Sequence, residues 1–188
     1  MKKGKIKKFW AFLQEDTWQS WLVSLILIIV LIKFIFFPAL SWITGSPLPL
    51  VVVESCSMYH STNFEQWWDR HSILYEDYNI SKSDFESYYF KNGLNKGDII
   101  LLWGRTTYEK GDVIIFNAGT QHPLIHRLVT APNFSTKGDN NDNQLPMEKS
   151  IPQENILGKG VVRIPFIGWI KLIFFDIFNS PDQRGFCH

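Results

Sequence analysis

The longest apolar stretch of the chain occupies residues 20–37, with the sequence SWLVSLILIIVLIKFIFF, and continues past Pro38 to Trp42 and Ile43. A helix over residues 21–42 would be roughly 33 Å long at about 1.5 Å per residue, which is enough to cross the hydrocarbon core of a bilayer. The run is too long for the apolar region of a cleaved secretory signal, and no small-x-small cleavage site follows it. The pattern therefore predicts a membrane anchor over residues 20–43.

The charges that flank this anchor predict its orientation. Lysines occupy positions 2, 3, 5, 7 and 8, and an excess of basic residues marks the cytoplasmic side of a membrane span. Lys33, the one charge inside the span, is close enough to its outer end to reach the interface. We therefore expect a single-pass protein of the cell membrane, with residues 1–19 in the cytoplasm and everything from Thr44 onward outside it.

Beyond the anchor, short runs of β-forming residues alternate with turn residues. Residues 49–58 read PLVVVESCSM, and the run from Leu50 to Val53 predicts a buried strand. The segments KGDIILLWGR at 96–105 and KGDVIIFN at 110–117 each place a Lys-Gly-Asp turn before a strand, and this repetition predicts that the two strands pair with each other. Further strands are expected in 122–130 and 155–165. The pattern predicts a mainly β domain over 44–165.

Three segments lack this pattern. Residues 60–95 are polar and aromatic and resemble an insertion, with short helices expected at 63–70 and 82–91 and with Ser81 or Ser83 capping the second. Residues 134–143 form a turn-rich loop. In the final segment, 166–188, the apolar run FIGWIKLIFFDIF is too short to span a bilayer comfortably. It predicts an interfacial helix or hairpin, and a tilted second span over 164–178 remains the alternative.

Composition adds a few exclusions. The 19 basic and 18 acidic residues nearly balance, so charge gives no reason to expect a nucleic-acid partner. The histidines lack the tight spacing of a metal site, and we predict neither a metal nor a cofactor. The two cysteines, Cys56 and Cys187, are not expected to form a disulfide, because a frayed terminal tail is a poor partner.

Candidate chemistry centres on Ser57. A serine hydroxyl is a weak nucleophile that needs a neighbouring base. Ser55 lies two positions earlier, so in a strand both hydroxyls would share one face, where one could attack and the other could bind the developing oxyanion. His126 interrupts the apolar run PLIHRLV and is the best candidate base. Asp139 and Asp142 are candidates to orient it.

Four motifs in order resemble the type I signal peptidases, in their archaeal and endoplasmic-reticulum branch. They are Ser-Cys-Ser-Met at 55–58, Gly-Asp-Val-Ile-Ile-Phe with Ile-His-Arg-Leu-Val at 111–129, Thr-Lys-Gly-Asp-Asn-Asn at 136–141, and Ile-Pro-Phe-Ile-Gly-Trp at 164–169. The resemblance covers the chain from the anchor onward, apart from the insertion. It implies an antiparallel β-sheet catalytic domain behind an N-terminal transmembrane helix.

The resemblance also implies residue roles. Ser57 matches the nucleophile, and its backbone N–H and the Ser55 hydroxyl match the oxyanion hole. His126 matches the general base and Asp139 the aspartate of the Gly-Asp-Asn-Asn box. A preprotein segment would then bind as an added strand beside the Val51–Val53 run, in contact with residues such as Val52, Val53 and Met58.

Three departures from the family pattern stand out. Cys56 replaces a usual glycine, His60 replaces a common proline, and the second aspartate of the family is absent around Gln144 and Leu145. Asp142 is the nearest substitute, so either Asp139 or Asp142 could hold the histidine. A lysine such as Lys137 acting as the base would be a third arrangement, although lysine is absent at position 126.

The sequence thus predicts a membrane-bound serine endopeptidase that removes signal peptides from exported preproteins after a small-x-small site. Its partners would be preprotein signal peptides and the lipid bilayer, with the secretion machinery as a further candidate. The alternative is a catalytically silent relative, a membrane-anchored β-domain that binds exported segments without cutting them.

Overall fold

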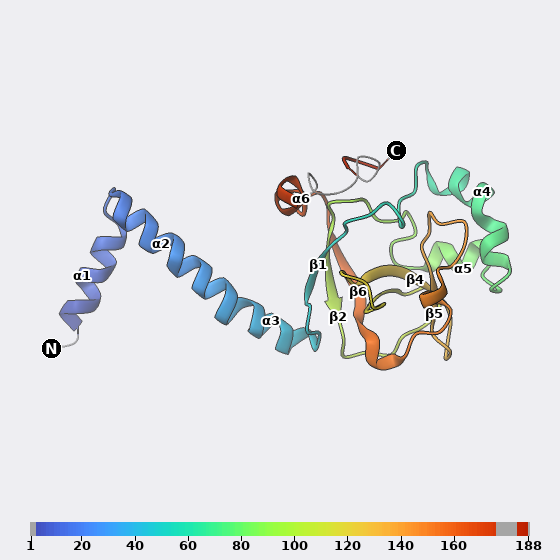
Figure 1. Ribbon diagram of the computed structural model, residues 1–188, viewed down its shortest axis with the longest axis horizontal. Coiled ribbons are helices and arrows are strands. Elements are labelled where there is room, and N and C mark those ends of the chain that lie inside the picture. Colours follow the sequence, from blue (N-terminus) through green and yellow to red (C-terminus); the bar gives the residue numbers. More distant parts are fainter. Residues whose placement is uncertain (1–2, 176–183, 188) are drawn as a thin grey trace. The chain divides into compact units, whose positions relative to one another are not determined.

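The structure is a computed structural model that describes residues 3–175 and 184–187 (Figure 1). It divides into two compact units, Met1–Ile43 and Thr44–His188, each of which is described by itself. The first is helical, and the second contains the sheet.

The first unit contains the apolar anchor. Helix α1, Lys3–Leu13, is followed by α2, Trp18–Leu31, which begins where the Thr17 side chain accepts a hydrogen bond from the Ser20 N–H. A π-helical stretch, η1 (Ile32–Phe36), leads into α3, Phe37–Thr44. Pro38 lacks the N–H that an α-helix would use, and the wider turn just before it accommodates this loss. Together Trp18–Thr44 make a 27-residue apolar helix that is long enough to cross a membrane.

The second unit is built on a six-stranded antiparallel sheet, which confirms the mainly β prediction. The strand order is β1-β2-β6-β3-β4-β5, and every neighbouring pair is antiparallel. The strands are β1 (Leu50–Val52), β2 (Ile99–Trp103), β3 (Val113–Phe116), β4 (Leu124–Thr130), β5 (Ser135–Lys137) and β6 (Ile156–Ile164). A core of buried aliphatic side chains lies against the sheet, among them Ile100, Leu102, Val113 and Ile115.

The predicted pairing of the two Lys-Gly-Asp strands is wrong, because β6 lies between them. Residue Lys159 of β6 aligns with Trp103 of β2 and with Ile114 of β3. A nine-residue strand can pair with β2 along one half and β3 along the other. The Lys-Gly-Asp sequence determines where each turn forms, whereas the partner strand comes from much later in the chain.

Strand β1 lies at the edge of the sheet rather than in its interior. Val53 exchanges main-chain hydrogen bonds with Gly97 and Asp98 next to β2. Because such bonds alternate along an antiparallel strand, the main-chain groups of Leu50 and Val52 point away from β2. These strand residues are half-buried, since β1 is the terminal strand of the sheet that the described residues form.

The insertion folds as two helices that cover the β4 and β5 side of the sheet (Figure 1). Helix α4, Phe64–Glu76, is capped by Asn63 and runs beyond the predicted end at residue 70. Helix α5, Lys82–Ser87, is capped by Ser81, which forms a capping box with Asp84. Their aromatic side chains form one buried cluster with Val129 of β4: Trp67, Trp68, Tyr75 and Phe85.

Short elements complete the unit. Two 3-10 turns, η2 (Pro146–Glu148) and η3 (Gln153–Asn155), precede β6, and strand β5 falls inside the segment predicted as a loop. After β6 comes α6, Trp169–Phe175, which lies beside β1 (Figure 1). Leu172 is buried, while Ile170, Ile173 and Phe174 are exposed. Residues 176–178 of the predicted interfacial segment lie outside the described residues.

Candidate active site

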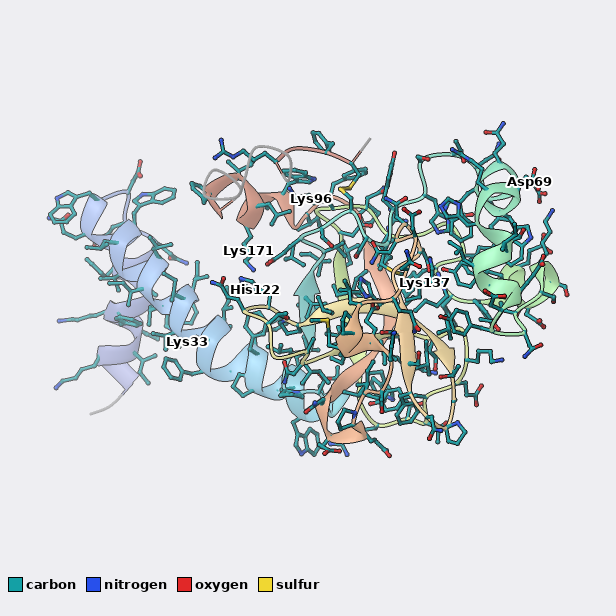
Figure 2. The ribbon with its side chains drawn as sticks, turned by 45° about the vertical axis from the view of Figure 1, so that its right-hand side comes forward. Lys33, Asp69, Lys96, His122, Lys137 and Lys171 are labelled. Atoms are coloured by element: carbon teal, nitrogen blue, oxygen red, sulfur yellow. A yellow bond between two sulfur atoms is a disulfide. The ribbon has the colours of Figure 1, made fainter. Side chains whose placement is uncertain are left out.

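A groove of about 840 Å³ runs between the open edge of β1 and the start of β4. Its wall on one side comes from Leu50 and Val52, and on the other from Leu124 and Ile125. His122 and Lys171, labelled in Figure 2, also line it; Lys171 forms an ion pair with Glu54, and His122 Nδ1 lies 3.7 Å from the same carboxylate. Ser57 and His126 line the same groove.

Ser57 sits in a turn that begins as β1 ends. The Tyr59 N–H closes this turn onto the Cys56 carbonyl at 3.1 Å. Asn140 binds it twice, because its backbone N–H donates to the Ser57 carbonyl at 2.8 Å and its side-chain amide donates to the Cys56 carbonyl at 3.1 Å. The buried side chain of Met58 ends the turn. The nucleophile candidate therefore has a defined main-chain position.

The structure brings three of the predicted residues together. The Ser57 hydroxyl lies 2.9 Å from His126 Nε2, and the Ser55 hydroxyl lies 3.1 Å from that of Ser57. The spacing argument placed the two serines on one face of a strand. The structure instead brings their hydroxyls together across the turn that follows β1. His126 itself is buried within β4.

The other nitrogen of His126 binds an acid that the sequence did not indicate. His126 Nδ1 hydrogen-bonds to Glu148 Oε1. Glu148 is fully buried in the η2 turn, where its carboxylate also accepts from Thr136 Oγ1 at 3.1 Å and from the Leu145 N–H at 2.7 Å. These donors stabilise a buried carboxylate beside the imidazole. Nothing in the local sequence around Glu148 points to this contact, since it lies 22 positions after His126.

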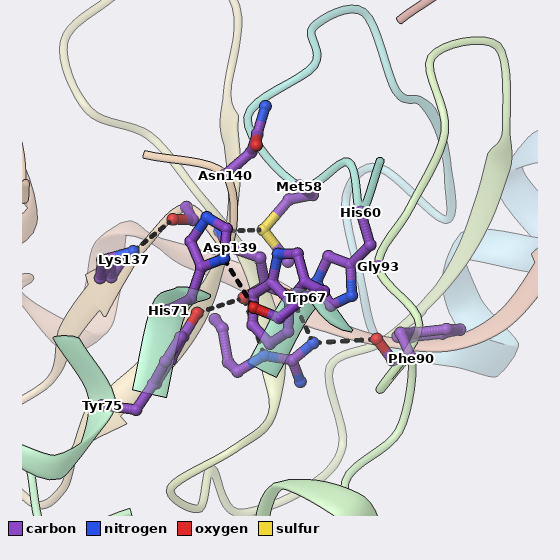
Figure 3. Close-up of polar contacts among 12 residues, drawn as sticks. Met58, His60, Trp67, His71, Tyr75, Phe90, Gly93, Lys137, Asp139 and Asn140 are labelled. Atoms are coloured by element: carbon purple, nitrogen blue, oxygen red, sulfur yellow. Dashed lines mark hydrogen bonds and ion pairs between the residues drawn. The ribbon is translucent and has the colours of Figure 1, made fainter. Parts of the chain in front are cut away.

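Asp139 belongs to a separate buried network of hydrogen bonds beneath the nucleophile turn (Figure 3). Its carboxylate accepts from Arg127 at 2.9 and 2.7 Å, from the Tyr75 hydroxyl at 2.8 Å and from His60 Nε2 at 3.1 Å. Its own N–H lies 3.4 Å from the Met58 sulfur. Arg127 donates its remaining hydrogens to three backbone carbonyls, those of Tyr89, Phe90 and Gly111. Asp139 thus anchors the insertion and β4 beneath the nucleophile turn.

The charges of this network follow from burial and pairing. Burial alone would raise the pKa of Asp139, but Arg127 and His60 outweigh it and hold that pKa well below its usual range. Burial lowers the pKa of His60 despite its bond to Asp139, so His60 is a neutral donor near pH 7. Burial, reinforced by Asp139, raises the pKa of Tyr75. The network is therefore one buried ion pair with neutral partners.

Neither remaining candidate is a hydrogen-bond partner of the His126 ring. Asp142 is exposed, and both ring nitrogens of His126 already have partners in Ser57 and Glu148. Lys137 is buried over the Tyr75 ring and donates to the Gly138 carbonyl, and burial lowers its pKa. Within residues 3–175 and 184–187, no group of three potential ligands could hold a metal ion.

The predicted substrate-contacting residues divide in two. Val53 and Met58 are almost fully buried, and both pack into the sheet's core. Val52 is half-buried on the open strand, and Ser55 is exposed. A bound segment would thus meet Val52 and Ser55 directly and rest on a floor formed by the other two.

The cysteine prediction is wrong. Cys56 and Cys187 form a disulfide across 131 positions of sequence, shown in yellow in Figure 2. The tail is not frayed at this point, because the Phe186 ring contacts that of Trp169 at a centroid distance of 4.6 Å.

Comparison with known proteins finds catalytic subunits of signal peptidases, which agrees with the serine–histidine pair of this site. No family model matches the chain. The chain is 27% identical over 178 residues to the protein named signal peptidase complex catalytic subunit sec11 of Sclerotinia sclerotiorum, covering 87% of this chain and 85% of that one. The proteins of the same name from Verticillium alfalfae and Pyricularia oryzae are each 26% identical over 155 residues, with 74% of this chain and 72% of theirs covered.

These similarities support the signal peptidase I family, in its endoplasmic-reticulum and archaeal branch. As a signal peptidase it departs from the family at the second aspartate, and the structure shows Glu148 in contact with the histidine instead. It also departs at Cys56, where the disulfide accounts for a side chain in place of the usual glycine.

Proposed function

We propose that this signal peptidase cuts signal peptides from preproteins with Ser57 as nucleophile, His126 as general base and Glu148 as the acid that orients the base. The observation that carries this proposal is the 2.9 Å hydrogen bond between Ser57 Oγ and His126 Nε2, in a groove beside an open strand. Glu148 supports it by accepting from Nδ1, which leaves Nε2 free to take the serine proton.

The chemistry then has two halves. Ser57 attacks the scissile carbonyl as His126 takes its proton, and the imidazolium that forms is stabilised by Glu148. The Ser55 hydroxyl, 3.1 Å from that of Ser57, and the Ser57 backbone N–H would donate to the developing oxyanion. His126 returns the proton to the leaving amine, and a water molecule, activated by the same base, hydrolyses the acyl-enzyme.

The open edge of β1 supports the mode of substrate binding. The outward main-chain groups of Leu50 and Val52 can pair with an extended preprotein segment, which would lead its scissile bond toward Ser57. The apolar walls of the groove would then hold the small side chains that precede the cut. A silent binder has less support, because the hydroxyls and the histidine form a complete hydrogen-bonded chain.

The membrane context follows from the anchor. The described residues contain one helix long and apolar enough to span a membrane, and we infer that the protein crosses it once, with its lysine-rich N-terminus in the cytoplasm and the sheet domain on the opposite side. The Cys56–Cys187 disulfide supports this orientation, since disulfides persist in oxidising compartments. The name of its relatives, a subunit of a complex, supports the proposal that further subunits assemble with it. We propose the secretion machinery and the bilayer as its other partners.

The test is cleavage of a model preprotein by the full chain in liposomes. Ser57→Ala and His126→Ala should each lower the rate by several orders of magnitude without unfolding the protein. Ser61→Ala makes the same chemical change at an exposed serine four positions away and should cut normally. Cutting by Ser57→Ala would mean that another residue is the nucleophile, and no cutting by folded wild type would favour the silent binder.

A further inference from the structure

The residue between the two serines is covalently bound to the far end of the described chain. Cys56 separates Ser55 from Ser57, and its sulfur is joined to that of Cys187. Both cysteines are only half-buried, so a small thiol or a partner protein's thiol can reach them. A disulfide in this position acts directly on the turn that carries the nucleophile.

The rest of the turn is held at its ends and through its carbonyls. Before it, Val53 is bonded to Gly97 and Asp98, and after it Met58 is buried. Within it, the two bonds from Asn140 fix the carbonyls of Cys56 and Ser57. The disulfide adds a covalent link that holds this segment through the Cys56 side chain.

The Cys187 end of the disulfide is itself fixed. Phe186 packs on Trp169, whose indole N–H donates to the Lys96 carbonyl at 3.1 Å. Gly97 lies directly against the same indole, because a Cβ at this position would come within 2.2 Å of the ring. Since Gly97 also bonds to Val53, the contacts close a ring that runs from Val53 through Trp169 and Cys187 back to Cys56.

We propose that Cys56–Cys187 is a redox site that sets the catalytic competence of Ser57. This proposal rests on the function proposed above. Oxidised, the disulfide closes the ring and holds Ser57 against His126. Reduced, the tail is released, and the turn keeps its hydrogen bonds, those to Asn140 among them, but loses its covalent anchor.

The exchange reaction needs a partner of the dithiol–disulfide class. A donor disulfide breaks as the Cys56–Cys187 bond forms, and the two protons lost by the cysteines are taken up by the donor's two sulfurs. An external dithiol reverses the reaction with the same balance. No metal or other cofactor is required for either direction.

The test uses the full chain in liposomes in three states: oxidised, reduced with dithiothreitol, and reoxidised with oxidised glutathione. Thiol alkylation followed by intact-mass measurement verifies each state. Because a displacement of about 1 Å can cost about 10²-fold in rate, reduction should lower kcat by that order and leave KM nearly unchanged. Reoxidation should restore kcat, which irreversible loss of the folded state would not allow.

Variants separate this effect from other actions of the reductant. Cys187→Ala should have the low kcat of the reduced protein and respond to neither reagent. The double variant Cys56→Ala, Cys187→Ala should behave in the same way. Hydrogen exchange of the peptide that covers residues 54–58 gives a readout without substrate, and exchange there should accelerate on reduction.

The outcomes distinguish the two proposals. If reduced wild type, verified by mass, keeps both its kcat and its slow exchange at residues 54–58, the redox inference is overturned. Cysteines that alkylate fully in the untreated protein would overturn it as well. If exchange responds to reduction but the oxidised protein cuts no better than Ser57→Ala, the positioning of the turn is upheld and the proposed peptidase activity fails.

Discussion

Replacing Glu148 by glutamine tests the assignment that the sequence missed. The Leu145 N–H donates to Glu148 Oε2 at 2.7 Å, so a glutamine would keep its carbonyl oxygen at that site. Its NH₂ group would then face His126 Nδ1 and Thr136 Oγ1, and the threonine hydroxyl can rotate to accept. The volume and the hydrogen bonds are preserved, but the donor and acceptor at Nδ1 are exchanged.

This exchange reverses the tautomer of the neutral His126 ring. A donor at Nδ1 obliges that nitrogen to accept, so neutral imidazole carries its proton on Nε2 and donates to Ser57 instead of taking its proton. Reversal of this kind in a serine protease triad costs about 10⁴ in kcat. At about 1.36 kcal/mol per tenfold change, the barrier rises by about 5.4 kcal/mol. We expect Glu148→Gln to approach this loss with KM little changed.

The assay is single-turnover cleavage of the model preprotein at saturating enzyme, with thermal melting to confirm that the variant is folded. Asp142→Asn is the matched control, because it makes the same carboxylate-to-amide change at an exposed side chain in the neighbouring loop. It should stay within about twofold of wild type. A folded Glu148→Gln that keeps a tenth of the wild-type kcat, or an Asp142→Asn that loses as much as Glu148→Gln, would refute the reasoning.

Three further predictions follow from the site. Gly138→Ala would place a Cβ 2.9 Å from His126 Nε2, so kcat should fall about 10²-fold in a folded protein, and an unchanged kcat in the preprotein assay would contradict this packing. Arg127→Met leaves Asp139 buried without its cation and should cost about 3–5 kcal/mol in chemical denaturation, whereas a loss under 1 kcal/mol would show that the ion pair is not needed. The pKa of His60 is lowered below its unfolded value of 6.5, so the unfolded state binds more protons below that pH and stability should fall as the pH drops from about 6.5. Melting curves of His60→Gln should show a smaller fall over pH 7.5–5, and identical slopes would exclude His60 as the cause.

Local pattern was enough to predict the anchor, the β class and the serine and histidine that the structure brings into contact. The anchor depends only on a long apolar run, and the fold class only on short β-forming runs separated by turns. The sequence points to Ser57 and His126 because Ser57 follows an apolar β-forming run and His126 interrupts one. A polar side chain at such a position indicates a specific role. The alternative bases and acids could be ranked but not resolved, because Asp139 and Asp142 look alike in a Gly/Asn/Asp turn.

Tertiary structure decided which groups meet. Glu148, three residues after Leu145 in a short 3-10 turn, reaches His126 only because β4, β5 and η2 fold against one another. Asp139 forms an ion pair with Arg127, which follows His126 in β4. The Arg127 side chain points to the insertion, whereas His126 lines the groove. The insertion of β6 between β2 and β3, and the joining of Cys56 to Cys187, likewise bring together residues far apart in the chain. Sequence patterns report on neighbours within a few residues, whereas these contacts depend on how distant segments pack, and that is why only the folded structure contains them.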